Sequence, residues 1–291
     1  MDIKKTFQNY FRPRPKTAHK GDFGRIFILA GSEGLSGACF LASMAALRSG
    51  AGLVTVGVPK CLVSPLARRL TEAMMLPLPQ TKEGTLSKSA YSKIKRYSDT
   101  QDILALGPGL SMNFQTQTLI RRVFLESKKP MIIDADGINA FQGKVDLFKK
   151  AKASVILTPH AGEFVRLFGG PKPQSDPERK RRALAIAKKY GVVIALKGHH
   201  TVVASPNGKI YMNKTGNPGM ATGGSGDVLT GVIAAMLGQH AEPYLAACFG
   251  VFIHGLAGDL AKKEKGEISL VAGDILNALP LAFQKVLRHN I

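Results

Sequence analysis

Tryptophan is absent from the 291-residue sequence, and cysteine occurs only three times, as Cys39, Cys61 and Cys248. The cysteines are widely spaced, odd in number and form no C-x-x-C pair. A disulfide framework and a zinc site are therefore disfavoured. The three side chains are instead expected to be small buried thiols in a reducing compartment.

Long apolar segments are also scarce. The first 20 residues are basic and lack the apolar core of a secretory signal. Residues Tyr244–Ala261 form the most apolar long stretch, but His254 and Asp259 interrupt it. Charged and polar groups are costly inside a bilayer, so the stretch predicts a buried helix of a globular protein. We expect a cytoplasmic protein without a membrane partner.

Acidic residues are few, with 20 Asp and Glu against 40 Lys and Arg, which gives a formal net charge of +20. Such a charge raises the local concentration of anions, whether nucleotides or nucleic acid. The basic residues gather at 179–182, 188–189 and 262–265 without interleaved aromatic residues. No nucleic-acid motif accompanies them, so solvated helical faces are favoured and no nucleic-acid partner is predicted.

Short apolar runs alternate with amphipathic segments along most of the chain. This alternation predicts one α/β domain over residues 1–291, with a mostly parallel central sheet covered by helices on both faces. Ligands of such sheets bind beyond the carboxyl ends of the strands. The predicted strands are Ile26–Leu29, Val54–Val58, Ile103–Leu106, Met131–Ile133, Val155–Leu157, Val192–Leu196 and Thr201–Ala204.

A glycine-rich segment, Asn217–Gly231, reads N-P-G-M-A-T-G-G-S-G-D-V-L-T-G. Its glycines allow consecutive amide N–H groups to converge on one point. Apolar residues at helical spacing follow, so a helix begins here and its N-terminal amides face the same point. The segment predicts an anion cradle that suits a phosphate. Its members are Gly223, Gly224, Ser225 and Gly226.

Asp227 falls in the first turn of that helix, where two interpretations remain open. Aspartate is a favourable helix-start residue that complements the helix dipole. A carboxylate beside a phosphate cradle is also well placed to take the proton from a hydroxyl that attacks a phosphoryl group. The flanking glycines favour the second role, and we predict that Asp227 is a general base.

Further candidate residues follow the predicted strands. Gly107-Pro108-Gly109 is either a ligand contact or an ordinary tight turn, and Ala38 by itself indicates only packing. Asp134 and Asp136 stand at positions i and i+2 at the end of a strand, so their side chains are expected on one side. They could hold Mg²⁺ through water, or start the next helix as an Asx-type turn.

Two more motifs stand at strand ends. Thr158–Glu163 reads T-P-H-A-G-E, in which His160 is a polar residue and Glu163 opens a helix. Lys197–Thr201 reads K-G-H-H-T between two predicted strands. This basic turn is either structural or a contact for the phosphate and ribose of a nucleotide.

Three motifs together resemble one family. The segments Asn213–Gly231, Thr158–Glu163 and His19–Gly24, which reads H-K-G-D-F-G, closely resemble those of the ADP- or ATP-dependent NAD(P)H-hydrate dehydratases. These enzymes are relatives of the ribokinase-like kinases. The resemblance extends from about His19 to the C-terminal region and implies a ribokinase-like fold.

The resemblance implies roles for individual residues. Ala38, Gly109, His160 and Asp227 would contact the hydrated nicotinamide substrate. Related vitamin kinases commonly carry Asn at the position of His160, and their glutamate, here Glu163, serves phosphate and magnesium. Glu163, together with Asp134 at its strand end, would hold Mg²⁺ through water. The nucleotide contacts would be Lys197, Gly198, His199, His200, Thr201 and Gly226.

The implied activity is the repair of the S-form of hydrated NADH or NADPH. ADP or ATP would phosphorylate the hydroxyl at carbon six, and phosphate would then leave. The resemblance further implies a homotetramer and a functional partnership with an NAD(P)H-hydrate epimerase, expected here as a separate protein. A vitamin-precursor kinase, a nucleic-acid-binding module and a catalytically silent metabolite-binding protein remain as alternatives.

Overall fold

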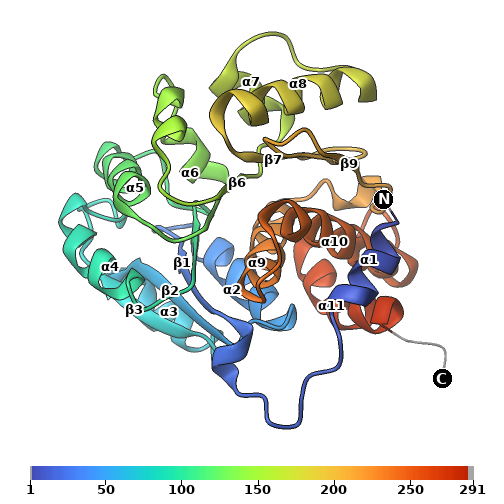
Figure 1. Ribbon diagram of the computed structural model, residues 1–291. Helices are drawn as coiled ribbons and strands as arrows, with labels where there is room; N and C mark the ends of the chain where they lie inside the picture. Colours follow the sequence, from blue (N-terminus) through green and yellow to red (C-terminus); the bar gives the residue numbers. More distant parts are fainter. Residues whose placement is uncertain (1, 288–291) are drawn as a thin grey trace.

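A nine-stranded sheet forms the centre of the molecule, as the computed structural model of residues 2–287 shows (Figure 1). The strand order is β3-β2-β1-β4-β5-β6-β7-β8-β9. Pairing is parallel from β3 to β7 and antiparallel for β7–β8 and β8–β9. The strands are β1 (Arg25–Leu29), β2 (Leu53–Pro59), β3 (Met74–Leu78), β4 (Ile103–Leu106), β5 (Met131–Ile133), β6 (Val155–Leu157), β7 (Val193–Leu196), β8 (Val202–Ala204) and β9 (Ile210–Met212).

Helices cover both faces of the sheet, which confirms the predicted fold class (Figure 1). One core cluster joins the sheet to α2, α9, α10 and α11, and a second joins it to α4, α5, α7 and α8. The helices are α1 (Ile3–Tyr10), α2 (Ser36–Arg48), α3 (Val63–Ala67), α4 (Tyr91–Ser98), α5 (Phe114–Glu126), α6 (Ala135–Asn139), α7 (Ala161–Phe168), α8 (Asp176–Tyr190), α9 (Ser225–Gly238), α10 (Pro243–Lys265) and α11 (Ala272–Leu287).

The seven predicted strands are confirmed because each is a short apolar run buried on both faces, as parallel strands between helices require. The sequence analysis missed β3 and β9, the two edge strands. Edge strands are only partly covered, and β3 also contains Pro77, which cannot donate to a ladder. Their apolar pattern is therefore weak.

The long apolar helix α10 is the one helix of the described residues that is long and apolar enough to cross a membrane. Of its most apolar window, 78% is buried inside the protein. Its contacts are chiefly with α9 and α11. The prediction of a buried helix is confirmed.

The strand order brings the candidate motifs to one edge of the sheet. Gly107, Asp134 and Lys197 follow β4, β5 and β7 directly, and His160 lies three residues beyond β6. The N-terminus of α9 lies at the same edge, because Thr230 on its second turn bonds to Asp134. This is the edge where ligands of parallel α/β sheets bind.

Candidate active site

The anion cradle lies at the N-terminus of α9. Gly224 adopts a left-handed conformation (φ 88°) as the N-cap residue, which a glycine accepts without strain. Within the described residues, the amides of Gly223, Gly224, Gly226 and Asp227 donate to no carbonyl or side chain. Unsatisfied donors at a helix N-terminus attract an anion. The geometry therefore supports the predicted phosphate cradle.

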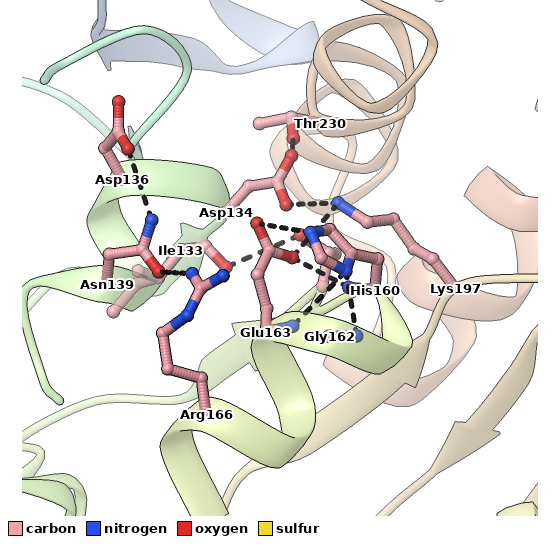
Figure 2. Close-up of polar contacts among 11 residues, drawn as sticks. Ile133, Asp134, Asp136, Asn139, His160, Gly162, Glu163, Arg166, Lys197 and Thr230 are labelled. Carbon is pink, nitrogen blue, oxygen red and sulfur yellow. Dashed lines mark hydrogen bonds and ion pairs between the residues drawn. The ribbon is translucent and has the colours of Figure 1, made fainter. Parts of the chain in front are cut away.

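Lys197 lies beside the cradle in a mostly buried ion-pair network (Figure 2). Its Nζ donates to Asp134 Oδ1 at 2.6 Å and lies 3.9 Å from Glu163 Oε2. A Cβ on Gly226 would be 3.3 Å from this Nζ, so the ammonium group borders the cradle. Burial acts to lower the pKa of Lys197, but Asp134 and Glu163 outweigh it and the pKa is raised. Lys197 is thus a fixed cation next to the anion site.

The carboxylate of Asp227 lies beside the cradle, since a Cβ on Gly224 would be 4.0 Å from its Oδ2. Burial and the negative charge of Asp134 raise its pKa to about 7, although Lys197 acts in the opposite direction. A carboxyl group with this pKa exchanges protons near neutrality, as a general base must. We call Asp134, Glu163, Lys197 and Asp227 the inner cluster.

Asp134 and Asp136 do not face the same side, so the predicted strand geometry is wrong. The strand β5 ends at Ile133, and Ala135 takes a positive φ of 47° that turns the chain into α6. Asp134 Oδ2 accepts from Thr230 at 2.8 Å (Figure 2). Asp136 instead accepts from Ser111 N at 2.8 Å. Asp134 belongs to the inner cluster, and Asp136 acts on that cluster only through its negative charge, which adds to the raised pKa of Asp227.

His160 caps α7 with its ring. Its Nδ1 accepts from the amides of Gly162 and Glu163 at 2.9 and 3.2 Å, and Glu163 Oε2 accepts from His160 N at 2.7 Å (Figure 2). The helix therefore begins at Ala161, two residues earlier than predicted. Because Nδ1 accepts, the ring proton is assigned to Nε2. The side chain is 55% exposed, and its Nε2 lies 3.6 Å from Glu163 Oε1.

The loop Lys197–Thr201 divides between two environments. Lys197 enters the inner cluster, but His200 Nδ1 pairs with Asp176 Oδ2 of α8 at 2.8 Å. Thr201 Oγ1 donates to the Gly198 carbonyl at 3.1 Å, and Arg179 of α8 donates to the carbonyl of His199. Of the five proposed nucleotide residues in this loop, the structure thus brings one to the cradle and ties the others to the loop or to α8. We call Asp176 and His200 the outer pair.

Ala38 and Gly109 lie together, as their proposed common role requires. A Cβ on Gly109 would be 2.9 Å from Ala38 Cβ. Leu41, one turn further along α2, reaches Gly224, where an added Cβ would be 2.5 Å from its Cδ1. The head of α2 therefore connects the Gly109 turn with the cradle.

Two polar residues of the site were missed by the sequence analysis. Thr230 holds the buried Asp134, and His254 of α10 lies with Nε2 3.4 Å from Ser225 Oγ beneath the cradle. Burial lowers the pKa of His254 to about 4, so it is neutral at pH 7. In the sequence, each of these polar residues stands within an otherwise apolar helical stretch, which was the available signal. No short-range pattern indicates that their partners are Asp134 and Ser225.

Two carboxylates beside the cradle, those of Asp134 and Glu163, are the candidate ligands for Mg²⁺. No group of three or more His, Cys, Asp or Glu side chains within residues 2–287 converges as a metal cage. Mg²⁺ is commonly held by one or two carboxylates, water and substrate phosphates. Asp134 and Glu163, which share Lys197 beside the cradle, fit that arrangement through water.

Fold and site together define a ribokinase-like α/β protein with a phosphate cradle and a carboxylate of raised pKa. A family model described as NAD(P)H-hydrate dehydratase matches residues 26–281. The chain belongs to the NAD(P)H-hydrate dehydratase family, as its motifs predicted.

Individual relatives support this membership. The chain is 41% identical over 273 residues to the bifunctional NAD(P)H-hydrate repair enzyme Nnr of Moorella thermoacetica. The match covers 94% of this chain and 52% of the relative. The chain thus spans about half the length of several curated relatives it matches. It is 36% identical to the ADP-dependent (S)-NAD(P)H-hydrate dehydratase of Neisseria meningitidis, over 94% of this chain and 89% of the relative.

A solved structure agrees with both. It is the ADP/ATP-dependent NAD(P)H-hydrate dehydratase of Bacillus subtilis, co-crystallised with ATP and Mg²⁺. The two chains are 32% identical, the match covers 97% of each, and the TM-score is 0.83. The resemblance therefore extends over nearly the whole fold.

Proposed function

We propose that the protein dehydrates the S-form of hydrated NADH or NADPH, with ADP or ATP as phosphoryl donor. The observation that carries the proposal is Asp227, a carboxylate with a pKa of about 7 directly beside unsatisfied cradle amides. The family supplies the substrate class, because its named members in Neisseria meningitidis and Bacillus subtilis are hydrate dehydratases.

The hydroxyl at carbon six is a poor leaving group, and the proposed chemistry replaces it. Asp227 takes the hydroxyl proton while the oxygen attacks the terminal phosphoryl group of the nucleotide. The bond from that phosphorus to the bridging oxygen breaks, which releases AMP from ADP or ADP from ATP. The cradle amides and Lys197 stabilise the negative charge of the transferred group.

Elimination completes the reaction. The electron pair of the ring nitrogen expels phosphate from carbon six, and loss of a proton from carbon five gives the reduced nicotinamide. The nucleotide is therefore consumed once for each ring repaired. Mg²⁺, held by Asp134 and Glu163 through water, would neutralise phosphate charge.

His160 is the proposed substrate contact that separates this reaction from simple phosphorylation. His160 is the N-cap residue of α7 and its side chain is 55% exposed, while Glu163 of the same helix borders Lys197. A protonated ring nitrogen can donate to the carboxamide or a phosphate of the substrate. The fixed Nδ1 contacts keep the ring oriented for this purpose.

The test is recovery of reduced-nicotinamide absorbance from racemic NADH hydrate with Mg²⁺ and ADP, ATP or no nucleotide. We expect recovery of about half of the material, because only one of two stereoisomers is used, and completion after an epimerase is added. A stable phosphorylated product without recovery would instead support a kinase. No nucleotide-dependent reaction would overturn both readings of the site.

We also propose that an NAD(P)H-hydrate epimerase cooperates with this protein, since relatives of twice its length are named bifunctional repair enzymes. A homo-oligomer is a further expectation from the family resemblance. Size-exclusion chromatography coupled to light scattering measures the assembly directly, and a monomer would contradict the expectation.

A further inference from the structure

A cavity of about 470 Å³ lies at the opposite end of α9 from the cradle. It is bounded by the C-terminal ends of α2 and α9, by α11, and by the segment 11–19 that follows α1. In Figure 1 that segment is the dark-blue loop at the bottom of the molecule. The 14 residues of α9 separate its two ends by about 20 Å. The cavity is therefore distinct from the candidate active site.

The H-K-G-D-F-G motif contributes to this cavity rather than to the active site. Asp22 and Phe23 line it. Gly24 packs against the end of α9, since a Cβ there would be 2.4 Å from the Gly238 carbonyl oxygen. The proposed catalytic chemistry does not use this motif. Its location at a cavity suggests a role in binding a ligand there.

Positive charge dominates the cavity wall. Arg12, Arg14 and Arg48 line it together with a single acidic residue, Asp22. Asp22 already accepts from His19 N at 2.9 Å. No carboxylate of residues 2–287 pairs with any of the three arginines. An anionic occupant would balance this charge.

Aromatic and apolar side chains form the rest of the wall. Arg14 lies over the ring of Phe23, with its Cζ 3.5 Å from the ring centroid, and donates to the Gly50 carbonyl at 2.7 Å. This arrangement presents a flat guanidinium and ring surface. The other apolar members are Tyr10, Phe11, Pro13, Pro280, Phe283 and Leu287.

A buried polar residue forms one corner of the cavity wall. Ser49 is only 3% exposed and lines the cavity, and its buried Oγ has no hydrogen-bond partner within the described residues. A buried hydroxyl without a partner costs free energy. The neighbouring Gln239 amide donates to the Ser49 carbonyl at 2.9 Å and holds this corner in place.

We propose that this cavity is a second, non-catalytic binding site for a nucleoside monophosphate. The volume suits a ligand of that size. Aromatic rings and the stacked guanidinium of Arg14 fit a planar base, and the free guanidinium groups of Arg12 and Arg48 fit the phosphate. Four aromatic residues in the wall favour a planar body over an acyl chain.

The absence of tryptophan permits a site-specific test. Tyr10→Trp, at a 37% exposed aromatic position of the cavity, introduces the protein's one tryptophan, whose fluorescence can be excited selectively. AMP is the probe, with adenosine, inorganic phosphate and octanoate as comparison ligands. We expect saturable quenching by AMP, weaker quenching by adenosine, and none by phosphate or octanoate. Thermal unfolding verifies that the reporter protein is folded.

A matched pair of variants separates specific binding from the general positive charge. Adding Arg12→Ala and Arg48→Ala to the reporter should weaken AMP binding by about tenfold or more, because charge-assisted hydrogen bonds are lost. Adding Arg68→Ala and Arg96→Ala, two exposed arginines outside the cavity, removes the same charge and should leave binding unchanged.

Three outcomes would overturn the proposal: no saturable response to AMP, equal weakening by both arginine pairs, or a response to octanoate alone. Nucleotide bound only at the cradle would not respond to the cavity arginines. Hydrate dehydration is measured separately, so loss of this site and failure of the proposed function are distinguishable.

Discussion

The loop Lys197–Thr201 contributes Lys197 to the inner cluster and His200 to the outer pair. The two groups differ in how far their side chains are buried. In the inner cluster the side chains of Lys197, Asp134 and Glu163 are 18%, 1% and 7% exposed. In the outer pair the side chains of His200 and Asp176 are 33% and 34% exposed. Water screens the outer pair, whereas the inner charges act on one another at low dielectric.

This difference in burial explains why chemistry is expected at only one end of the loop. Burial and Asp134 raise the pKa of Asp227 to about 7. The hydrogen bond from His200 instead lowers the pKa of Asp176, which remains an ordinary ionised surface carboxylate. The family resemblance implies the same role, nucleotide binding, for all residues of Lys197–Thr201. In the structure the two ends of this loop lie in different environments.

The largest effect is expected for Asp227→Asn, which removes the proposed base and keeps its size. Turnover of NADH hydrate should fall roughly 10²- to 10⁴-fold, as expected for loss of a general base. Affinity for ADP or ATP should remain largely intact, because the cradle amides are unchanged. Steady-state kinetics and calorimetric titration measure the two quantities. Full turnover in the variant would overturn the assignment.

Lys197→Met should weaken the fold as well as activity. It leaves the buried carboxylate of Asp134 without its cation, which costs roughly 3 kcal/mol of unfolding free energy. Urea unfolding of the variant measures this loss. The double variant Lys197→Met with Asp134→Asn should recover part of the stability, because no unpaired buried charge remains. Equal stability of single and double variants would contradict a buried ion pair.

His160→Asn should separate helix capping from substrate binding. Asparagine is a good N-cap residue, so the melting temperature should remain near that of the wild type. The imidazole Nε2 is lost, so KM for NADH hydrate should rise by about tenfold. His160→Ala is the matched control, which should lose about 1 kcal/mol of stability as well. An unchanged KM in both variants would exclude a substrate contact.

The smallest effect is expected for His200→Ala. Its ring pairs with Asp176 of α8 in a partly exposed position, away from the cradle. KM for ADP or ATP and the melting temperature should both remain close to the wild-type values. A large rise in the nucleotide KM would remove the distinction between the inner cluster and the outer pair.

The sequence predicted what depends on local pattern. Buried runs such as Ile103–Leu106 predicted the parallel strands, and the glycines before Asp227 predicted a cradle at a helix start. The resemblance to a known family added the roles of residues such as Ala38, which composition alone does not reveal.

Long-range contacts could not be predicted in the same way. Thr230 and Asp134 are 96 positions apart, and only the packing of α9 against the sheet brings their side chains within 2.8 Å. The turn at Ala135, with its positive φ of 47°, separates Asp134 from Asp136 and is unusual for alanine. The i, i+2 spacing therefore predicted that the side chains of Asp134 and Asp136 point to the same side, which the turn at Ala135 prevents.

The most direct test of the central claim is the pH dependence of kcat/KM for NADH hydrate. The base must be ionised, so kcat/KM should rise about tenfold per pH unit below the pKa of Asp227 and become constant above about pH 7. Asp227→Asn should remove this rise and leave only low activity. A wild-type profile that is flat between roughly pH 5 and 8 would contradict a half-buried Asp227 of raised pKa acting as general base.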